Sequence, residues 1–214
     1  MRILHLILTL KRILKYLVSN KKRYANLLLL ILLRRPKSIM EIGVYNGLRA
    51  KEMIEAAKIF NNKIRYYGFD LFEEFDKKKL VSEHSKTPLS KNKIKKKISK
   101  LCSVKLFKGF TSKTLPIFVR KKININFIFI DGGHAIKTIQ NDWHYCSKII
   151  NKESIIMFDD YYLNDKKVIK KFGSNNLFDK LPQKKYHKKL LPLIDNFNFK
   201  DYTQSIRMFY VKLK

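Results

Sequence analysis

The chain has 214 residues, 45% of them hydrophobic, which is enough for one well-buried domain without a second one. A formal charge of +30 is typical of nucleic-acid-binding or membrane-surface proteins, but lysine outnumbers arginine by 38 to 9. Because arginine is the better bidentate phosphate ligand, specific nucleic-acid binding is disfavoured, and two cysteines without metal or disulfide spacing favour a cytoplasmic protein.

Residues 1–35 form a predicted helical extension that is amphipathic and basic. Apolar residues between positions 3 and 18 alternate with Lys11, Arg12 and Lys15, and a second apolar run covers 27–33. Neither run reaches the ~20 apolar residues that span a bilayer. We expect a helical pair packed on the domain. The alternative is a basic helix that rests on anionic lipid, which would place the protein peripherally at the inner face of the membrane.

Residues 36–214 form the predicted main domain, in which strands alternate with helices. Strands are expected at 38–42, 63–69, 103–107, 125–130 and 154–158, with helices over 48–60 and from about 111. From residue 190 two more strands are expected, the last at 206–211. This order predicts an α/β fold: a doubly wound, mostly parallel, Rossmann-like sheet of about seven strands with helices on both faces.

Two lysine-rich inserts, at 77–100 and 164–189, interrupt this order. The first holds ten lysines and one glutamate. Both inserts follow strand ends on the side of the sheet where ligands bind. They are interpreted as solvated helices and loops. A basic lid over an anionic acceptor is the functional alternative.

Carboxylates follow two neighbouring strands at their carboxyl ends. Asp131 opens the sequence Asp-Gly-Gly-His directly after 125–130, and Asp159 and Asp160 follow 154–158. Adjacent parallel strands bring such side chains into one crevice. Three ionised carboxylates would repel one another unless a hard cation such as Mg²⁺ neutralises them. The pattern therefore predicts a metal site.

The turn after the first strand and the end of the second strand carry the features of a nucleoside site. Gly43 and Gly47 allow the first turn to run close to a ligand, although Tyr45 stands where the dinucleotide fingerprint has glycine. Asp70 is placed to accept hydrogen bonds from two ribose hydroxyls, or else to cap the following segment. Glu41, in the first strand, occurs together with Gly43, Gly47 and Asp70, and this combination favours the nucleoside role.

These motifs resemble those of the class I S-adenosylmethionine-dependent methyltransferases. Residues 41–47 are similar to the first motif of the family and 68–70 to its second, while 130–134 and 158–160 resemble the metal-dependent sugar O-methyltransferases of the macrocin type and, more distantly, catechol O-methyltransferase. The resemblance covers about residues 36–162. It implies a donor site of Glu41, Gly43, Tyr45, Gly47, Asp70, Gly109, Phe110 and Asp131, and Mg²⁺ (or another divalent cation) held by Asp131, Asp159 and Asp160.

The implied reaction requires an acceptor hydroxyl to lose a proton, which His134 is placed to take, with Asp131 beside it. Alternatively, His134 opens the next helix or orients Asp131. The leading hypothesis is a Mg²⁺-assisted O-methyltransferase for a small acceptor such as a sugar or glycan precursor, anionic if the lysine-rich inserts take part. An RNA methyltransferase, supported by charge alone, and a non-catalytic protein of this fold at a membrane surface are the alternatives. No oligomeric state is predicted.

Overall fold

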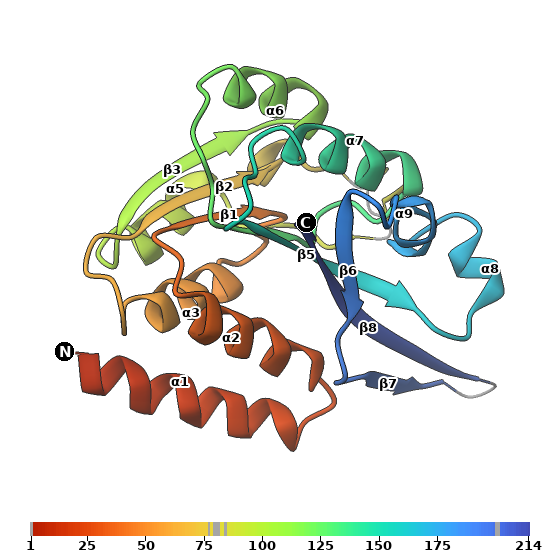
Figure 1. The fold of residues 1–214 in the computed structure, drawn as a ribbon, viewed down its shortest axis with the longest axis horizontal. Coiled ribbons are helices and arrows are strands. Elements are labelled where there is room, and N and C mark those ends of the chain that lie inside the picture. Colours follow the sequence, from red (N-terminus) through yellow and green to blue (C-terminus); the bar gives the residue numbers. More distant parts are fainter. Residues whose placement is uncertain (1, 77, 79–81, 84, 200–201) are drawn as a thin grey trace.

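The computed structural model describes residues 2–76, 78, 82–83, 85–199 and 202–214, and its centre is a single eight-stranded sheet (Figure 1). The strand order is β3-β2-β1-β4-β5-β8-β6, and β7 pairs with β8 outside this path. The strands are β1 (Ser38–Ile42), β2 (Arg65–Asp70), β3 (Ser103–Lys108), β4 (Phe127–Ile130), β5 (Ile155–Tyr162), β6 (Tyr186–Leu190), β7 (Asp195–Asn198) and β8 (Thr203–Leu213). The first five are parallel and the last three are antiparallel to their neighbours, which confirms the predicted mostly parallel α/β sheet.

Helices cover both faces of the sheet, as predicted (Figure 1). One hydrophobic core joins the sheet to α1 (Arg2–Leu17), α2 (Arg23–Arg34), α3 (Leu48–Ala57) and α5 (Lys91–Ile98). The other joins it to α6 (Thr111–Val119), α7 (Ile136–Cys146) and α9 (Asn175–Lys180). Every residue of β1 and of β4 is buried, because both strands lie between these two helical layers.

The fifth strand differs from the prediction in its length and in one irregularity. The sequence predicts that it ends at Phe158, whereas β5 continues to Tyr162. Phe158 pairs with Phe209 and Tyr161 with Arg207, so two residues of β5 face one residue of β8. This is a β-bulge, and it contains Asp159 and Asp160, the second of which has a φ of 56°. The two carboxylates therefore lie within the strand and not in a loop after it.

The carboxyl-terminal part of the chain also contains one strand more than predicted. Three strands follow residue 185 instead of the expected two, because β6 and β7 each pair with β8, which is 11 residues long. The predicted sheet of about seven strands thus has eight.

The predicted helical extension consists of α1 and α2. Helix α2 is an integral part of the core: Leu27, Leu28 and Ile31 are at most 1% exposed. Among the described residues, no helix is long and apolar enough to cross a membrane.

The lysine-rich inserts are partly helical. The first contains α5, and residues 77, 79–81 and 84, which belong to the same prediction, lie outside the described part of the chain. The 3-10 helix η1 (Phe72–Glu74) precedes this insert. The second insert contains α8 (Lys166–Ile169), α9 and the start of β6.

Candidate functional site

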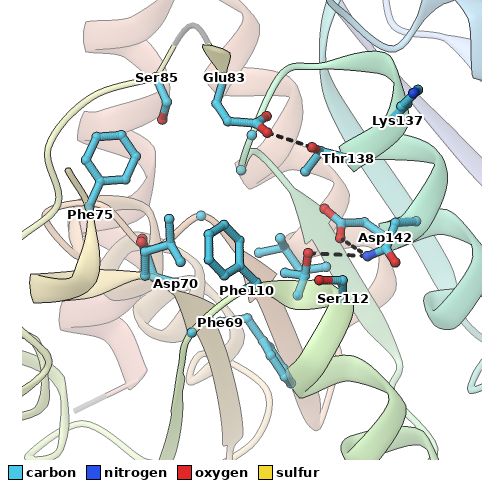
Figure 2. A pocket seen from close by; sticks show the side chains of 18 residues that line it. Phe69, Asp70, Phe75, Glu83, Ser85, Phe110, Ser112, Lys137, Thr138 and Asp142 are labelled. Carbon is cyan, nitrogen blue, oxygen red and sulfur yellow. Dashed lines mark hydrogen bonds between the residues drawn. The ribbon is translucent and has the colours of Figure 1, made fainter. Parts of the chain in front are cut away.

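Two cavities lie side by side at the carboxyl edge of the parallel strands. The first has a volume of about 240 Å³ and is lined between β2, α6 and α7 (Figure 2). The second, of about 390 Å³, extends from the turn after β1 toward β5 and the β7–β8 hairpin. Gly43, Asp70, Ser85 and Gly132 line both cavities. A ligand that fills the first cavity can therefore reach into the second.

Gly43 brings the turn after β1 against the turn after β4. Its φ is +89°, and a Cβ atom at this position would lie 2.0 Å from the carbonyl oxygen of Asp131. The backbone N–H of Asp131 donates to the carbonyl of Ile42, which closes the contact. Only glycine meets both requirements, so Gly43 fixes Asp131 relative to the first strand.

Asp70 holds the same turn from the other side. One carboxylate oxygen accepts a hydrogen bond from the N–H of Tyr45 at 2.8 Å, and the other from the N–H of Phe72 at 3.2 Å. Burial raises the pKa of Asp70, although these backbone N–H groups counteract part of the rise. Asp70 thus both caps the following segment and lines the two cavities, so the two predicted roles are compatible.

The first cavity contains further predicted residues and some that the sequence did not indicate. Gly109 and Phe110, two of the predicted donor-site residues, line it. Glu83 also lines it and accepts a hydrogen bond from the Thr138 hydroxyl at 2.9 Å (Figure 2). Asp142 of α7 lines it as well, is completely buried, and has one oxygen, Oδ2, without a hydrogen-bond partner among the described residues. Burial raises the pKa of Asp142 to about 7.

Two predicted donor residues, Glu41 and Gly47, do not line either cavity. Glu41 is fully buried beneath the turn, where it accepts a hydrogen bond from the Tyr66 hydroxyl, and burial raises its pKa to about 8. Gly47 adopts a left-handed conformation directly before α3. Both residues shape the turn, and direct contact with a donor stays a prediction for them. Tyr45, by contrast, lines the second cavity.

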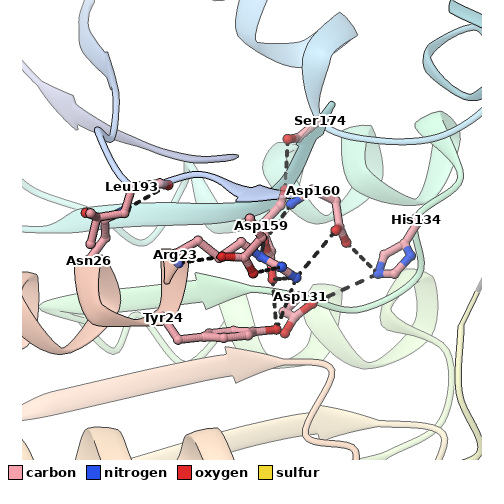
Figure 3. Close-up of polar contacts among 10 residues, drawn as sticks. Arg23, Tyr24, Asn26, Asp131, His134, Asp159, Asp160, Ser174 and Leu193 are labelled. Atoms are coloured by element: carbon pink, nitrogen blue, oxygen red, sulfur yellow. Dashed lines mark hydrogen bonds and ion pairs between the residues drawn. The ribbon is translucent and has the colours of Figure 1, made fainter. Parts of the chain in front are cut away.

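The structure brings together three of the predicted chemical groups in the second cavity: Asp131, His134 and Asp160 (Figure 3). One ligand atom from each lies within 4.8 Å of the others. The imidazole Nε2 of His134 is 2.8 Å from Oδ2 of Asp160 and 4.0 Å from Oδ1 of Asp131. His134 therefore contacts the acidic residue of β5 more closely than the one predicted to be its partner.

Asp159 lies outside this three-residue cluster and contacts the guanidinium of Arg23. Nε of Arg23 donates to Oδ1 of Asp159 at 2.7 Å and its Nη2 to Oδ2 at 3.1 Å, which is a bidentate pair (Figure 3). The Tyr24 hydroxyl donates to the same Oδ2, and the N–H of Asp160 to Oδ1. Arg23 also pairs with Asp195 of β7. For Asp159 to bind a metal, as predicted, Arg23 would have to move.

Neighbouring charges set the protonation of the cluster. Burial alone would lower the pKa of His134, but Asp160, Asp131 and Asp159 outweigh it and raise this pKa to about 9. Burial and the other two carboxylates raise the pKa of Asp131 well above its ordinary value. A cluster with these shifts attracts a further positive charge.

Sequence reasoning missed Arg23 and Tyr24 as residues of the site. Both lie at the start of α2, 136 and 135 positions before Asp159, and both line the second cavity. The signal in the sequence is weak: Arg23 stands shortly before the apolar run at 27–33, far from the aspartates that it contacts.

A family profile described as a methyltransferase domain matches residues 40–161, more than half of the chain. The chain belongs to this family. The match contains the turn after β1, Asp70, the cluster of Asp131 and His134, and the bulge of β5. The predicted family is thereby confirmed.

Other known proteins are similar to this methyltransferase domain. Uncharacterized protein R132 of Acanthamoeba polyphaga mimivirus is 29% identical over 124 residues, which are 57% of this chain and 50% of that protein, so the match spans half of the relative. The O-methyltransferase TomG from Streptomyces achromogenes, solved with S-adenosylmethionine, has a TM-score of 0.60 at 12% identity, covering 88% of this chain and 78% of its own. CalS11, a TDP-rhamnose 3'-O-methyltransferase, has a TM-score of 0.51 at 20% identity, with coverages of 85% and 76%. At these identities the two structures establish the fold of the methyltransferase domain.

Proposed function

We propose that this methyltransferase domain transfers the methyl group of S-adenosylmethionine to a hydroxyl of a small acceptor, such as a sugar or glycan precursor, with the help of a divalent cation. The observation that carries the proposal is the pair of adjoining cavities: a nucleoside-type cavity on one side of Gly43 and Asp70, and a cavity with an acidic cluster on the other. Two reactants held in this way are oriented for direct transfer.

The first cavity suits the nucleoside of the donor. Asp70 ends β2 where an acidic residue can accept hydrogen bonds from vicinal ribose hydroxyls, and Phe110 offers an apolar surface beside it. Gly43 keeps the turn free of a side chain at the passage between the cavities. The sulfonium methyl of a donor bound here would point into the second cavity.

The residues of the acidic cluster fit a divalent cation. Asp131 and Asp160 offer carboxylate oxygens, the ligands that hard divalent cations prefer, and the imidazole of His134 lies beside them within the 4.8 Å span given above. When bound, such a cation would stabilise an acceptor oxygen that is losing its proton. Because both oxygens of Asp159 contact Arg23, we propose Asp131 and Asp160 as the principal ligands, with Asp159 holding α2.

His134 is proposed to hold a proton on Nε2 at the acceptor side. With a pKa of about 9, its imidazole is protonated at neutral pH while Asp160 is its partner. Additional positive charge beside these carboxylates lowers the pKa of the imidazole and enables it to accept a proton. The base role therefore depends on the cavity being loaded.

The second cavity favours an acceptor with negative charge. Lys21, Lys86 and Arg49 line it in addition to Arg23. Phe197 and Phe199 line the part formed by the β7–β8 hairpin, which suits the apolar face of a sugar ring or an attached group. An acceptor that carries a phosphate, such as a nucleotide-linked or lipid-linked sugar, matches both features.

Calorimetry and a methyl-transfer screen against nucleotide sugars test this function. The wild-type chain should bind S-adenosylhomocysteine, and Asp70→Ala should weaken that binding about tenfold or more through loss of charged hydrogen bonds. Asp160→Asn should keep donor binding and lose cation-dependent turnover and Mn²⁺ binding. The control is Glu153→Gln, which also removes one negative charge but at an exposed position.

Four results would contradict the proposal or one of its parts. Absence of donor binding would favour a non-catalytic protein. Equal Mn²⁺ affinity of Asp160→Asn and the wild type would remove the cation from this cluster. A loss of Mn²⁺ affinity in Asp159→Asn as large as that in Asp160→Asn would show that Arg23 moves aside and that Asp159 is also a ligand. Sequence-selective RNA binding near physiological salt would favour an RNA substrate.

A further inference from the structure

Helix α1 presents its apolar side to solvent and its more polar side to the protein. The face packed on the domain consists of His5, Thr9, Ile13 and Tyr16. The solvent-exposed side of the helix carries large apolar residues, of which Ile3 is 74% exposed and Leu14 63%. Its members are Ile3, Ile7, Leu10, Leu14 and Leu17, called the α1 stripe below; they recur at intervals of four and three residues and so share one side of the helix.

The inner face of α1 shows that this orientation is fixed by specific contacts. The Tyr16 hydroxyl donates to Glu52 of α3 at 2.8 Å, and Arg12 pairs with Glu55. The Thr9 hydroxyl donates to the carbonyl of His5 within the helix. The helix therefore cannot turn its apolar side inward without breaking buried polar contacts. Contiguous exposed apolar surface of this kind marks an interaction site.

The charge around the stripe identifies its partner. Residues 1–40 contain ten lysines and arginines and no aspartate or glutamate. Lys11 and Lys15 are exposed on α1 itself, adjacent in sequence to Leu10 and Leu14. Packing of α1 against α1 of a second copy would bring these cations together, and residues 1–40 supply no acid to neutralise them. An anionic lipid surface offers both the apolar layer and the opposite charge.

We propose that the α1 stripe docks on an anionic membrane surface with α1 lying in the interface. An aromatic pair supports this assignment: Phe199 and Tyr202 are each 51% exposed, and their rings stack at 4.8 Å. Aromatic residues of this kind are enriched at membrane interfaces.

The segment that follows α1 reaches the proposed acceptor cavity. Lys21, which follows α1, and Phe199 both line that cavity. The docked protein would therefore present the cavity close to lipid headgroups, which favours a lipid-linked acceptor. This last consequence, unlike the docking itself, rests on the proposed function.

Sedimentation of the full chain with vesicles tests the docking without any turnover assay. The wild type should partition onto vesicles that contain phosphatidylglycerol much more strongly than onto pure phosphatidylcholine. The double variant Leu10→Gln/Leu14→Gln, which keeps every charge, should lose at least about tenfold in partitioning. Lys11→Gln and Lys15→Gln should each lose about fivefold. Ile117→Gln, which changes an apolar residue of α6 that is 59% exposed, is the matched control and should bind as the wild type does.

Each contrary outcome is distinct. Equal partitioning of the double variant and the wild type would show that charge alone causes adhesion and would overturn the proposal. A wild-type dimer that becomes monomeric in the double variant, with unchanged vesicle binding, would assign the stripe to a second copy. Binding of S-adenosylhomocysteine by each variant confirms that it is folded, and its failure in the wild type would concern the proposed function alone.

Discussion

Replacing Arg23 with glutamine should destabilise the fold strongly, because it removes the counter-charge of two buried carboxylates. The side chains of Asp159 and Asp195 are 1% and 0% exposed, and Arg23 contacts both. Breaking a buried ion pair by removal of one partner costs about 3–5 kcal/mol. For a domain of this size each kcal/mol lowers the melting temperature by about 2–4 °C, so a decrease of roughly 6–20 °C is expected.

A double-mutant cycle separates this effect from loss of packing. Asp159→Asn removes one of the two carboxylates, so the double variant Arg23→Gln/Asp159→Asn should be less destabilised than the sum of the single variants. The expected coupling is about 1–3 kcal/mol. Urea denaturation supplies the unfolding free energies, and Arg65→Gln, at an exposed position of β2, is the control. A decrease below about 1 kcal/mol for Arg23→Gln, or additivity in the cycle, would refute the reasoning.

The pH dependence gives the same prediction a second test. Without Arg23 the pKa of Asp159, which burial already raises, should rise further. A buried carboxyl with a raised pKa binds its proton more readily when folded, so the deficit of Arg23→Gln relative to the wild type should shrink as the pH falls from 7 to 5. A deficit that is constant over this range would show that charge is not its cause.

Three further predictions concern the two cavities. The raised pKa of His134, about 9, means that its imidazolium stabilises the folded state by about 3 kcal/mol. This contribution should be complete below pH 6.5 and lost as the pH rises through 9. Denaturation of the wild type and of His134→Gln between pH 6 and 10 measures it, and a difference in stability that does not change with pH would contradict it. Gly43→Ala should abolish binding of S-adenosylhomocysteine in calorimetry, because the alanine Cβ would overlap the carbonyl of Asp131. Wild-type affinity of this variant would exclude the close contact between the turns after β1 and β4. Asp142→Asn should weaken binding of S-adenosylhomocysteine about tenfold, because the unpartnered oxygen of Asp142 is placed to accept an N–H from the ligand. Binding of the analogue that lacks the adenine amino group should be weakened much less. An equal loss of affinity for both ligands would assign Asp142 a purely structural role.

The parallel half of the fold was predictable because the central strands are short apolar runs and the run of each parallel strand is followed by, or ends at, glycine or aspartate. Strand β1 and the start of β3 agree with the predicted residues, and Asp70 and Asp131 stand at the predicted strand ends. Burial on both faces leaves a continuous apolar signal in the sequence. The cavities formed from these strand ends follow from the same rule.

The bulge in β5 was not predictable from the same signal. Two aspartates after an apolar run have the composition of a loop, yet β8 continues to pair with the strand beyond them. The bulge places Asp160 at a φ of 56°, next to His134, while the preceding residue faces α2. Adjacent carboxylates of identical type therefore differ in their closest partner: Asp159 forms the bidentate pair with Arg23, whereas Asp160 is 2.8 Å from His134 and 4.0 Å from Arg23.

The contact between Arg23 and Asp159 links the amino-terminal helices to the chemistry of the second cavity. Helix α2 starts at this contact, and the Tyr16 hydroxyl of α1 donates a hydrogen bond to Glu52 of α3, the helix that follows the turn after β1. The two helices are thus fixed to both cavities by buried polar contacts. If α1 docks on a surface as proposed, that surface would therefore orient the second cavity as well, because both belong to the same domain.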